Sequence, residues 1–302
     1  MALQIPKLVK PGDKVAVVAT ARVVDEKAVR QGIKTLESWG LQVLQGNSLF
    51  ECHQLFAGTD EQRLRDLQSA LDDPDIRAII CARGGYGTTR IIDQLDWSLF
   101  KKSPKWVCGF SDVTALLCAI HNLGFASLHC SMPQLFTGKG ADQDIASIRQ
   151  ALFEEPVILE ARPYRQNQAG TGEGLVVGGN LSILTHLIGT NSSISTDGKI
   201  LMLEEVNEYQ YQLDRMMVQL ARSGKISKLV GVVVGHLTSI KQGDLKFDMD
   251  AIGIIKSHLK HLKIPIGFGF PIGHESPNLA IPFGVNAELT VTETGSTLRL
   301  KY

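Results

Sequence analysis

The sequence predicts an α/β protein in which an N-terminal, doubly wound parallel sheet is joined to a smaller, β-rich C-terminal domain. Three observations predict this class. Short apolar runs rich in β-branched residues alternate with helical patterns through the first half of the chain. A stretch of turn-forming composition follows at residues 162–174, and the C-terminal end has the alternation of a hairpin. We therefore expect an N-terminal domain over residues 1–155, a linker over 156–172 and a C-terminal domain over 173–302.

The N-terminal half alternates strands and helices. A first strand is expected at residues 14–20, where a continuous apolar run is typical of a strand covered on both faces. Residues 25–40 and 59–74 have helical spacing, the second helix with Thr59 as its N-cap. Further strands are expected at IRAIICA and KWVCGF, and a further helix at DVTALLCAIHN. In such a sheet, ligands and catalytic groups collect at the carboxyl ends of the strands.

The C-terminal half is less regular. Its strand candidates include GKILMLEEV and LVGVVVGHLT, with a helix expected near residues 209–222. In that helix Met216 and Met217 have core spacing, so we interpret both methionines as packing rather than as a cofactor site. The tail AELTVTETGSTLRLKY predicts a β-hairpin whose turn contains Gly295.

Composition and charge exclude several classes of function. The chain has 302 residues with 31 basic and 31 acidic side chains, so its charge gives no reason to expect nucleic acid or a membrane surface as a partner. The longest apolar runs fall short of the roughly 20 residues that a membrane span needs. The N-terminus lacks the order of a signal peptide, and the five cysteines form no CxxC pair. We expect a cytoplasmic protein without a metal or other cofactor.

Ser111 lies where the strand KWVCGF turns into the helix that follows. The stretch GFSDV, residues 109–113, is similar to the GxSxG elbow that presents a serine nucleophile on a sharp turn, although valine stands in the fifth position. A helix that begins at Asp112 directs N–H groups toward an oxyanion beside Ser111. The alternative is that Ser111 only caps this helix.

The motif ARGGYG, residues 82–87, follows the preceding strand. Its three glycines permit left-handed dihedral angles and a close approach of the backbone to a ligand. The spacing matches neither a dinucleotide fingerprint nor a P-loop. A turn of this kind can supply the second N–H group of an oxyanion hole, or it can be an ordinary tight turn.

A serine nucleophile needs a base, because the hydroxyl is almost never ionised at neutral pH. Of the eight histidines, His129 and His236 end apolar strands, whereas His274 stands in the Gly- and Pro-rich loop GFGFPIGHESPN. That composition suits a site residue and favours His274 narrowly. Glu204 and Glu205 end the strand GKILMLEEV, and alternation directs one carboxylate toward the site and the other toward solvent or a helix N-terminus.

Five motifs taken together resemble a known family. They are RGGYGTTRIIDQLDW, CGFSD, GGNLSILTHLIGT, LMLEEVNEYQYQLDRMM and GFPIGHE, in the order seen in the LD-carboxypeptidases. That family comprises the murein tetrapeptide carboxypeptidases and their microcin C immunity relatives. The resemblance runs from about residue 13 to the C-terminus and implies a Ser-Glu-His triad carried by an α/β domain and a β-rich domain. One departure is HCSMP, where many relatives have Gly-Pro ahead of the methionine.

By motif matching, the resemblance implies that Ser111 is the nucleophile and His274 its base. It chooses Glu204 over Glu205 as the acid that orients the base, a choice that strand alternation leaves open. The implied reaction removes the terminal D-alanine from a cytoplasmic muropeptide tetrapeptide during cell-wall recycling, through an acyl-enzyme and without a cofactor. The family also suggests a homodimer.

The resemblance further implies that the backbone N–H groups of Gly85 and Asp112 hold the oxyanion. An exopeptidase must also bind a free carboxylate, for which Arg83 and Asn180 are candidate anchors. Arg83 can equally pair with a structural acid. The expected partner is a small peptide or muropeptide.

Three other functions stay open. An α/β-hydrolase esterase also has serine, acid and histidine in chain order, but the mixed C-terminal half and the valine of the elbow argue against it. An immunity-type relative would cleave an aminoacyl-nucleotide conjugate, and the lack of an aromatic-rich insertion in the sequence favours muropeptide instead. A non-catalytic ligand-binding protein would keep the same fold with a vestigial site.

Overall fold

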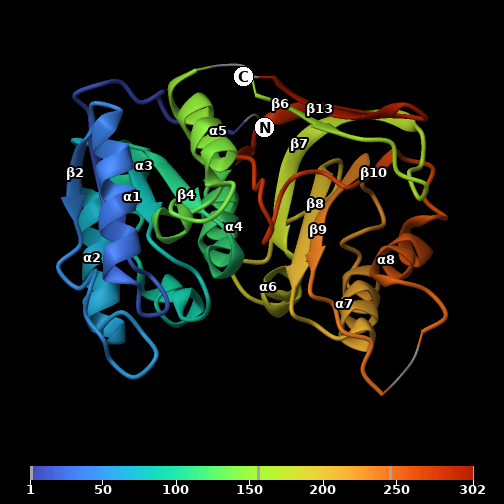
Figure 1. Cartoon of the computed structure of the whole chain (residues 1–302), viewed down its shortest axis with the longest axis horizontal. Coiled ribbons are helices and arrows are strands. Elements are labelled where there is room, and N and C mark those ends of the chain that lie inside the picture. The colour runs from blue at the N-terminus through green and yellow to red at the C-terminus, as the bar shows by residue number, and fades with distance from the viewer. Residues whose placement is uncertain (1–2, 155–156, 245–246, 302) are drawn as a thin grey trace. The chain divides into compact units, whose positions relative to one another are not determined.

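The chain folds into two compact units. The structure, a computed structural model, describes three stretches of the chain, residues 3–154, 157–244 and 247–301. The N-terminal unit consists of Met1–Glu155 with Leu279–Phe283, and the C-terminal unit of Pro156–Asn278 with Gly284–Tyr302. Figure 1 shows the ribbon of both units and labels their elements where there is room. The predicted α/β class, with a parallel N-terminal sheet and a β-rich C-terminal part, is confirmed.

The N-terminal unit is built on a six-stranded sheet in the order β11-β5-β4-β3-β1-β2. Its strands are β1 (Lys14–Val18), β2 (Gln42–Gln45), β3 (Ile76–Cys81), β4 (Trp106–Gly109), β5 (Ser127–His129) and β11 (Ile281–Phe283). Strands β1 to β5 run parallel, and β11 is antiparallel to β5. The strand order reverses at β1, which pairs with β2 on one side and β3 on the other. Such a reversal is where open α/β sheets place their ligands.

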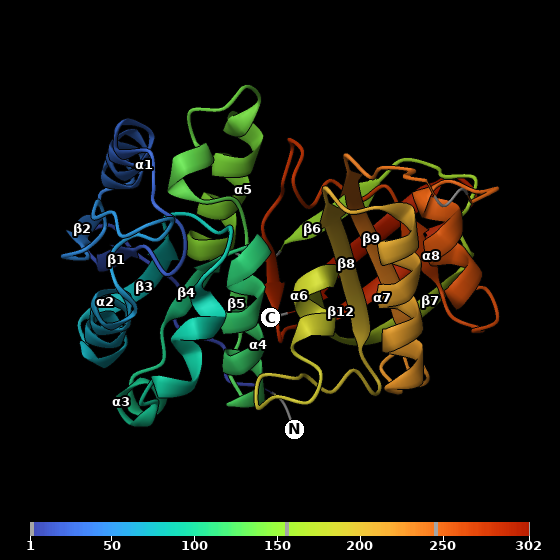
Figure 2. The ribbon, with the colours of Figure 1, turned by 90° about the horizontal axis from the view of Figure 1, so that it is seen from below.

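Helices cover both faces of this sheet, with α1 and α5 on one face and α2, α3 and α4 on the other (Figure 2). They are α1 (Glu26–Ser38), α2 (Asp60–Asp72), α3 (Ser98–Lys102), α4 (Thr114–Asn122) and α5 (Ala141–Phe153). Four short 3-10 turns are η1 (Thr88–Arg90), η2 (Ile92–Gln94), η3 (Ser111–Val113) and η4 (Pro133–Leu135). The predicted Thr59 cap of α2 is confirmed, and its exchange of hydrogen bonds with Gln62 completes a capping box.

The C-terminal unit is built on a mixed, seven-stranded sheet in the order β10-β9-β8-β7-β12-β13-β6. Its strands are β6 (Ile158–Ala161), β7 (Gly170–Asn180), β8 (Ile200–Val206), β9 (Gly231–Thr238), β10 (Ile266–Phe268), β12 (Asn286–Thr292) and β13 (Gly295–Lys301). Strands β7 to β10 are parallel neighbours, whereas β12, β13 and β6 pair antiparallel. Its helices are α6 (Leu181–His186), α7 (Gln210–Arg222) and α8 (Ala251–Leu259).

Three details of the chain path differ from the sequence-based expectation. Residues 156–172, expected as a linker, include β6 and the start of β7, because these segments find antiparallel partners in β13 and β12. Strand β11 lies within the expected C-terminal domain but pairs with β5 of the N-terminal unit. The C-terminal hairpin forms, but Gly295 pairs with Thr292 and so begins β13 instead of lying in the turn.

The apolar runs that predicted the strands form most of the core of each unit. Val15 and Val17 of β1 are fully buried, as are Val232 and Val234 of β9. The five cysteines are free thiols, and four of them are buried. Within the described ranges, no helix has the length and apolar character needed to cross a membrane.

Candidate active site

Ser111 stands on a sharp turn between β4 and α4. Strand β4 ends at Gly109, and Ser111 opens the turn η3 with a backbone φ of 62°. A helix cap takes an extended conformation, and the cap positions of η3 and α4 are occupied by Phe110 and Val113. The left-handed region costs a residue other than glycine about 1–2 kcal/mol. The backbone at Ser111 therefore fits a strained elbow better than a helix cap.

The glycine-rich loop between β3 and η1, residues 82–87, packs directly against this elbow. A Cβ atom on Gly84 would lie 3.2 Å from Ser111 Cβ and 3.4 Å from Asp112 N. The next residue, Gly85, has a φ of 112°, a value that side chains disfavour. Gly87 has a φ of 138°, and a Cβ atom there would lie 2.8 Å from Arg63 Nη1. All three glycines of the motif are therefore required by close approach or by backbone conformation.

Hydrogen bonds fasten the glycine-rich loop to the elbow. The buried carboxylate of Asp112 accepts from Thr88 N, directly after the loop, at 2.9 Å. The hydroxyl of Thr88 lies 3.0 Å from the hydroxyl of Thr20, which follows β1. The residue after the candidate nucleophile thus belongs to the same network that holds the loop.

Arg63 of α2 is a fully buried cation that supports the same loop. Its Nη1 donates to the carbonyl oxygens of Thr20 at 2.5 Å and of Gly87 at 3.1 Å, and its Nη2 pairs with Asp60. Sequence reasoning missed this residue. A signal was present, because Arg63 and the buried Leu67 are four residues apart and share one face of the helix.

The N–H groups expected to hold an oxyanion belong to Gly85 in the loop and Asp112 in the elbow. Asp112 is the second residue of η3, and the first N–H groups of a helix have no acceptor within it. The close approach of Gly84 to Asp112 N brings the two backbone segments together within one unit. The backbone N–H groups of Gly85 and Asp112 therefore stay the predicted hydrogen-bond donors to the oxyanion.

Glu204 and His274 form a hydrogen-bonded pair in the C-terminal unit. Glu204 is fully buried near the end of β8, and its Oε2 lies 2.7 Å from Nδ1 of His274. A proton on Nδ1 lets the ring donate to the carboxylate, so the basic nitrogen of the neutral ring is Nε2. The side chain of His274 keeps 18% of its surface exposed, as a base that meets substrate must. The acid and the base of a serine-peptidase triad have this relation.

The loop that carries His274 is anchored on both sides of the imidazole. Gly273 N donates to Asn278 Oδ1 at 2.9 Å, and Glu275 N donates to His236 Nδ1 at 3.3 Å. Gly273 has a φ of 128°, and a Cβ atom there would lie 3.1 Å from the carboxylate oxygen that accepts from the base. Burial lowers the pKa of His236, which favours the neutral ring that can accept a hydrogen bond. His236 therefore helps to position the loop that carries His274.

Glu205, the neighbour of Glu204, supports helix α6 instead. Its carboxylate accepts from Ser182 N at 2.7 Å, from Val206 N at 2.8 Å and from Asn180 Nδ2 at 3.0 Å. Burial raises the pKa of Glu205 to about 7. The two carboxylates thus diverge as strand alternation predicts. Among the described residues, no group of three or more His, Cys, Asp or Glu side chains is placed to hold a metal ion.

Asn180 lies at the junction of β7 and α6. Its Oδ1 accepts from Ile183 N at 3.1 Å, which caps α6, while its Nδ2 donates to Glu205. The side chain is nearly buried. These bonds hold the side chain of Asn180 at the start of α6, and its role as an anchor for a substrate carboxylate stays a prediction.

Arg83 has a second cation beside it. Its Nη1 donates to Val23 O, and burial together with the nearby charge of Arg22 lowers the pKa of Arg83. The side chain of Arg22 packs over Gly85, where a Cβ atom would collide with it. Among the described residues neither guanidinium forms an ion pair. Arg22 follows β1 at the carboxyl end of the sheet, and that position was the signal by which sequence reasoning could have found it.

The candidate site residues are divided between the two units. Ser111, Gly85, Asp112 and Arg83 belong to the N-terminal unit, and Glu204, His274 and Asn180 to the C-terminal unit. Of the other histidines considered as bases, His129 is fully buried in β5. His274 is therefore the candidate that combines partial exposure with a carboxylate partner at the carboxyl end of a strand.

Comparisons with known proteins find relatives that match almost the whole chain. Family models described as the LD-carboxypeptidase N-terminal and C-terminal domains match residues 15–130 and 173–289. A probable murein peptide carboxypeptidase of Bacillus subtilis is 37% identical over 296 residues, covering 95% of this chain and 92% of the relative. The murein tetrapeptide carboxypeptidase of Pseudomonas aeruginosa is 30% identical over 290 residues, with 91% and 92% covered. The crystal structure of muramoyltetrapeptide carboxypeptidase from Oxalobacter formigenes superposes with a TM-score of 0.87 and 28% identity, covering 96% of this chain and 99% of the other.

Proposed function

This chain is a serine carboxypeptidase of the LD-carboxypeptidase family, and we propose that it releases the terminal D-alanine from the tetrapeptide of a muropeptide through an acyl-enzyme on Ser111. The hydrogen bond between Glu204 and His274 carries the proposal. A buried carboxylate that fixes the tautomer of a partly exposed imidazole is what the activation of a serine requires. The left-handed turn at Ser111 supports the same assignment from the other unit.

The proposed chemistry proceeds in two halves. Nε2 of His274 takes the proton of Ser111 as Oγ bonds to the scissile carbonyl carbon, and Glu204 stabilises the imidazolium. The resulting oxyanion accepts from the N–H groups of Gly85 and Asp112, each worth about 3 kcal/mol of the barrier. When the C–N bond breaks, His274 gives its proton to the leaving amine of D-alanine. Water, activated by the same imidazole, then hydrolyses the ester on Ser111.

The free carboxylate of the leaving residue needs a cationic site next to the nucleophile. We assign this role to Arg83 together with Arg22. Arg83 belongs to the glycine-rich loop that supplies one proposed oxyanion donor, and Arg22 packs over Gly85 of that loop. Neither guanidinium forms an ion pair among the described residues. Two neighbouring unpaired cations repel each other, and a bound carboxylate removes that cost.

Mass spectrometry of the products tests the proposed function. The purified protein is incubated separately with a murein tetrapeptide, the corresponding tripeptide and an aminoacyl-nucleotide conjugate. We expect D-alanine from the tetrapeptide and no cleavage of the other two. Cleavage of the nucleotide conjugate alone would assign the chain to the immunity-type activity, and no cleavage of any substrate would favour a ligand-binding protein.

We place the reaction in the cytoplasm, where muropeptides are recycled, and expect the protein to act as a homodimer. Cell fractionation and light scattering test these two points. A secreted or strictly monomeric active protein would contradict them without affecting the chemistry at Ser111.

A further inference from the structure

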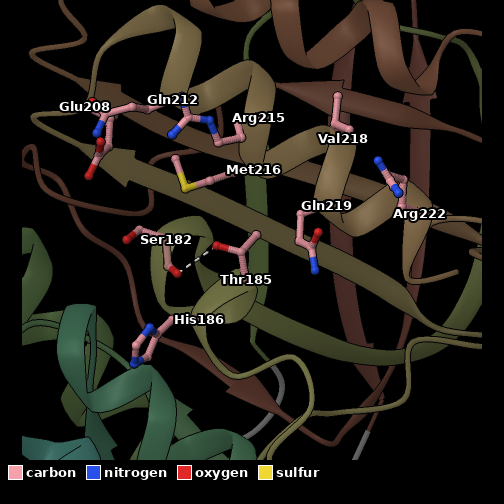
Figure 3. A pocket seen from close by; sticks show the side chains of 10 residues that line it. All are labelled: Ser182, Thr185, His186, Glu208, Gln212, Arg215, Met216, Val218, Gln219 and Arg222. Carbon is pink, nitrogen blue, oxygen red and sulfur yellow. Dashed lines mark hydrogen bonds between the residues drawn. The ribbon is translucent and has the colours of Figure 1, made fainter.

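Two groups of polar side chains in the C-terminal unit lie outside the Glu204–His274 pair. One lines a pocket of about 570 Å³ between α6 and α7 (Figure 3). Met216 was expected in the core beside Met217 but is only partly buried and lines this pocket, because α7 buries only one of its faces. The side chains drawn in Figure 3 include neither member of the catalytic pair. The other group surrounds His236 of β9, which contacts the loop that carries His274 and therefore bears on the reaction.

His236 holds this loop on both sides of His274. Its backbone N–H donates to the carbonyl oxygen of Ile272 at 2.8 Å. A Cβ atom on Gly273 would lie 3.2 Å from Cβ of His236, so the loop passes in close contact with β9. After the base, Glu275 N donates to Nδ1 of the His236 ring at 3.3 Å. One residue of β9 therefore positions the chain immediately before and immediately after the imidazole of the base.

The hydrogen bond from Glu275 requires the neutral form of the His236 ring. Nδ1 can accept a hydrogen bond only when it carries no proton, and in a neutral imidazole the proton is then on Nε2. A protonated imidazole has a donor on each nitrogen, so its Nδ1–H would face the N–H of Glu275. Because two donors cannot bond to each other, protonation of His236 removes the attachment of the loop after the base.

The charged groups that act on His236 lie on β8 and on the loop itself. Burial lowers the pKa of His236, the carboxylates of Glu275 and Glu204 raise it, and a charge on His274 lowers it. The net result is a pKa below the ordinary value of 6.5, so the ring is neutral at neutral pH. His236 is partly exposed, and a proton from water can therefore reach it as the pH falls.

We propose that His236 is a positioning residue whose protonation switches off the catalytic loop. With a neutral ring, both attachments of the loop hold the imidazole of His274 beside Glu204. With a charged ring, the attachment at Glu275 is lost and turnover falls. A neutral His236 also keeps a second cation away from the imidazolium that forms on His274 during the reaction. The proposal rests on the proposed function, in which His274 is the base.

Two substitutions of His236 separate the hydrogen bond from the charge. In His236→Asn, Oδ1 takes the position of Nδ1 and accepts from Glu275 N at every pH, because an amide does not titrate in this range. His236→Leu keeps an apolar side chain of similar size but has no acceptor. At pH 8 we expect His236→Asn to keep kcat/KM within about threefold of the wild type and His236→Leu to lose about tenfold. Urea denaturation shows whether both variants are folded.

The pH profile of kcat/KM between pH 5 and pH 8 tests the switch. In the wild type His274 and His236 must both be neutral, so activity falls on the acid side more steeply than for one proton. His236→Asn keeps only the dependence on His274. Its kcat/KM relative to the wild type should therefore rise from about one at pH 8 to about ten once His236 is protonated. His258→Asn is the matched control, because His258 is a partly buried histidine of α8 that bonds to Asp214 at 2.7 Å, and its profile should have the wild-type shape.

Parallel profiles of the wild type and His236→Asn would overturn the proposal, and so would NMR resonances that show a neutral His236 ring down to pH 5. If the wild type releases no D-alanine, the proposed function fails. The rate at which a serine-directed phosphonate labels Ser111, followed over the same pH range in the same variants, then decides whether His236 controls the base. A protein that is not labelled at Ser111 would contradict both proposals.

Discussion

The two units hold their candidate catalytic groups by different means. In the N-terminal unit the backbone does so, because Ser111 has a φ of 62° and Gly84 lies against it. In the C-terminal unit side chains do so, through the 2.7 Å hydrogen bond from His274 to the buried Glu204. The nucleophile should therefore be sensitive to changes of backbone conformation, and the base to the loss of a single carboxylate.

The largest effect is expected at Ser111. Replacement by alanine or glycine removes Oγ, and either change should lower kcat by about 10⁵-fold or more. Ser111→Gly should also be about 0.5–1 kcal/mol more stable than Ser111→Ala, because glycine relieves the left-handed strain. Urea denaturation and D-alanine release measure the two quantities. Equal stability of the two variants would show that the elbow is not strained, and activity within tenfold of wild type would exclude Ser111 as the nucleophile.

Glu204 and Glu205, the two adjacent carboxylates of β8, allow the effect of losing the partner of His274 to be compared with the effect of losing a neighbouring carboxylate. Glu204→Gln should lower kcat about 10⁴-fold with the fold intact, because an amide no longer holds Nδ1 protonated. Glu205→Gln should stay within tenfold of wild type, since Glu205 bonds to the start of α6. Steady-state kinetics of both variants is the measurement. Losses of similar size in the two variants would contradict the assignment of Glu204 as the orienting acid.

Arg63 links the backbone of the glycine-rich loop to the segment that follows β1. Arg63→Met should destabilise the protein by about 3–5 kcal/mol, because buried carbonyl oxygens at Thr20 and Gly87 lose their donor. Arg90→Met removes the exposed partner of the same Asp60 and should change stability little. Equal effects of the two variants in urea denaturation would show that burial of Arg63 does not support the loop.

A pH effect is expected from Glu205. Burial raises the pKa of its carboxyl from 4.5 to about 7, so the folded state holds this proton where the unfolded state has released it. The free energy of unfolding should therefore fall as pH rises from about 4.5 to 7, by at most about 3 kcal/mol. Glu205→Gln should lack this decline. Denaturation of both proteins at pH 5 and pH 8 measures it, and parallel curves would refute a raised pKa.

Local patterns were sufficient to predict most of the sheets and the polar residues at their carboxyl ends. A few neighbouring residues determine the apolar run of β1 and the Thr59 cap of α2. The same is true of the positions of Ser111 and Glu204, each of which follows an apolar strand. Alternation along β8 also predicted that Glu204 and Glu205 diverge. Which of the two faces the base was not decided by alternation, because a strand alone does not say which face is the site.

Features that depend on distant residues were not visible in the sequence. The three residues of β11 carry no periodicity, so nothing local shows that they pair with β5 and join the N-terminal unit. A buried Arg63 depends on carbonyl acceptors in two other segments, and the left-handed φ of Ser111 depends on the close approach of Gly84. Arg22 becomes a site residue only through its position over Gly85.

The most direct test of the central claim is the reaction of the protein with a serine-directed phosphonate, followed by peptide mapping in a mass spectrometer. We expect a single adduct on Ser111, formed at least about 100-fold more slowly in His274→Ala, because general-base catalysis contributes roughly 10²–10⁴-fold. An adduct on another serine, no adduct at all, or the same rate in His274→Ala would show that His274 does not activate Ser111 as a nucleophile.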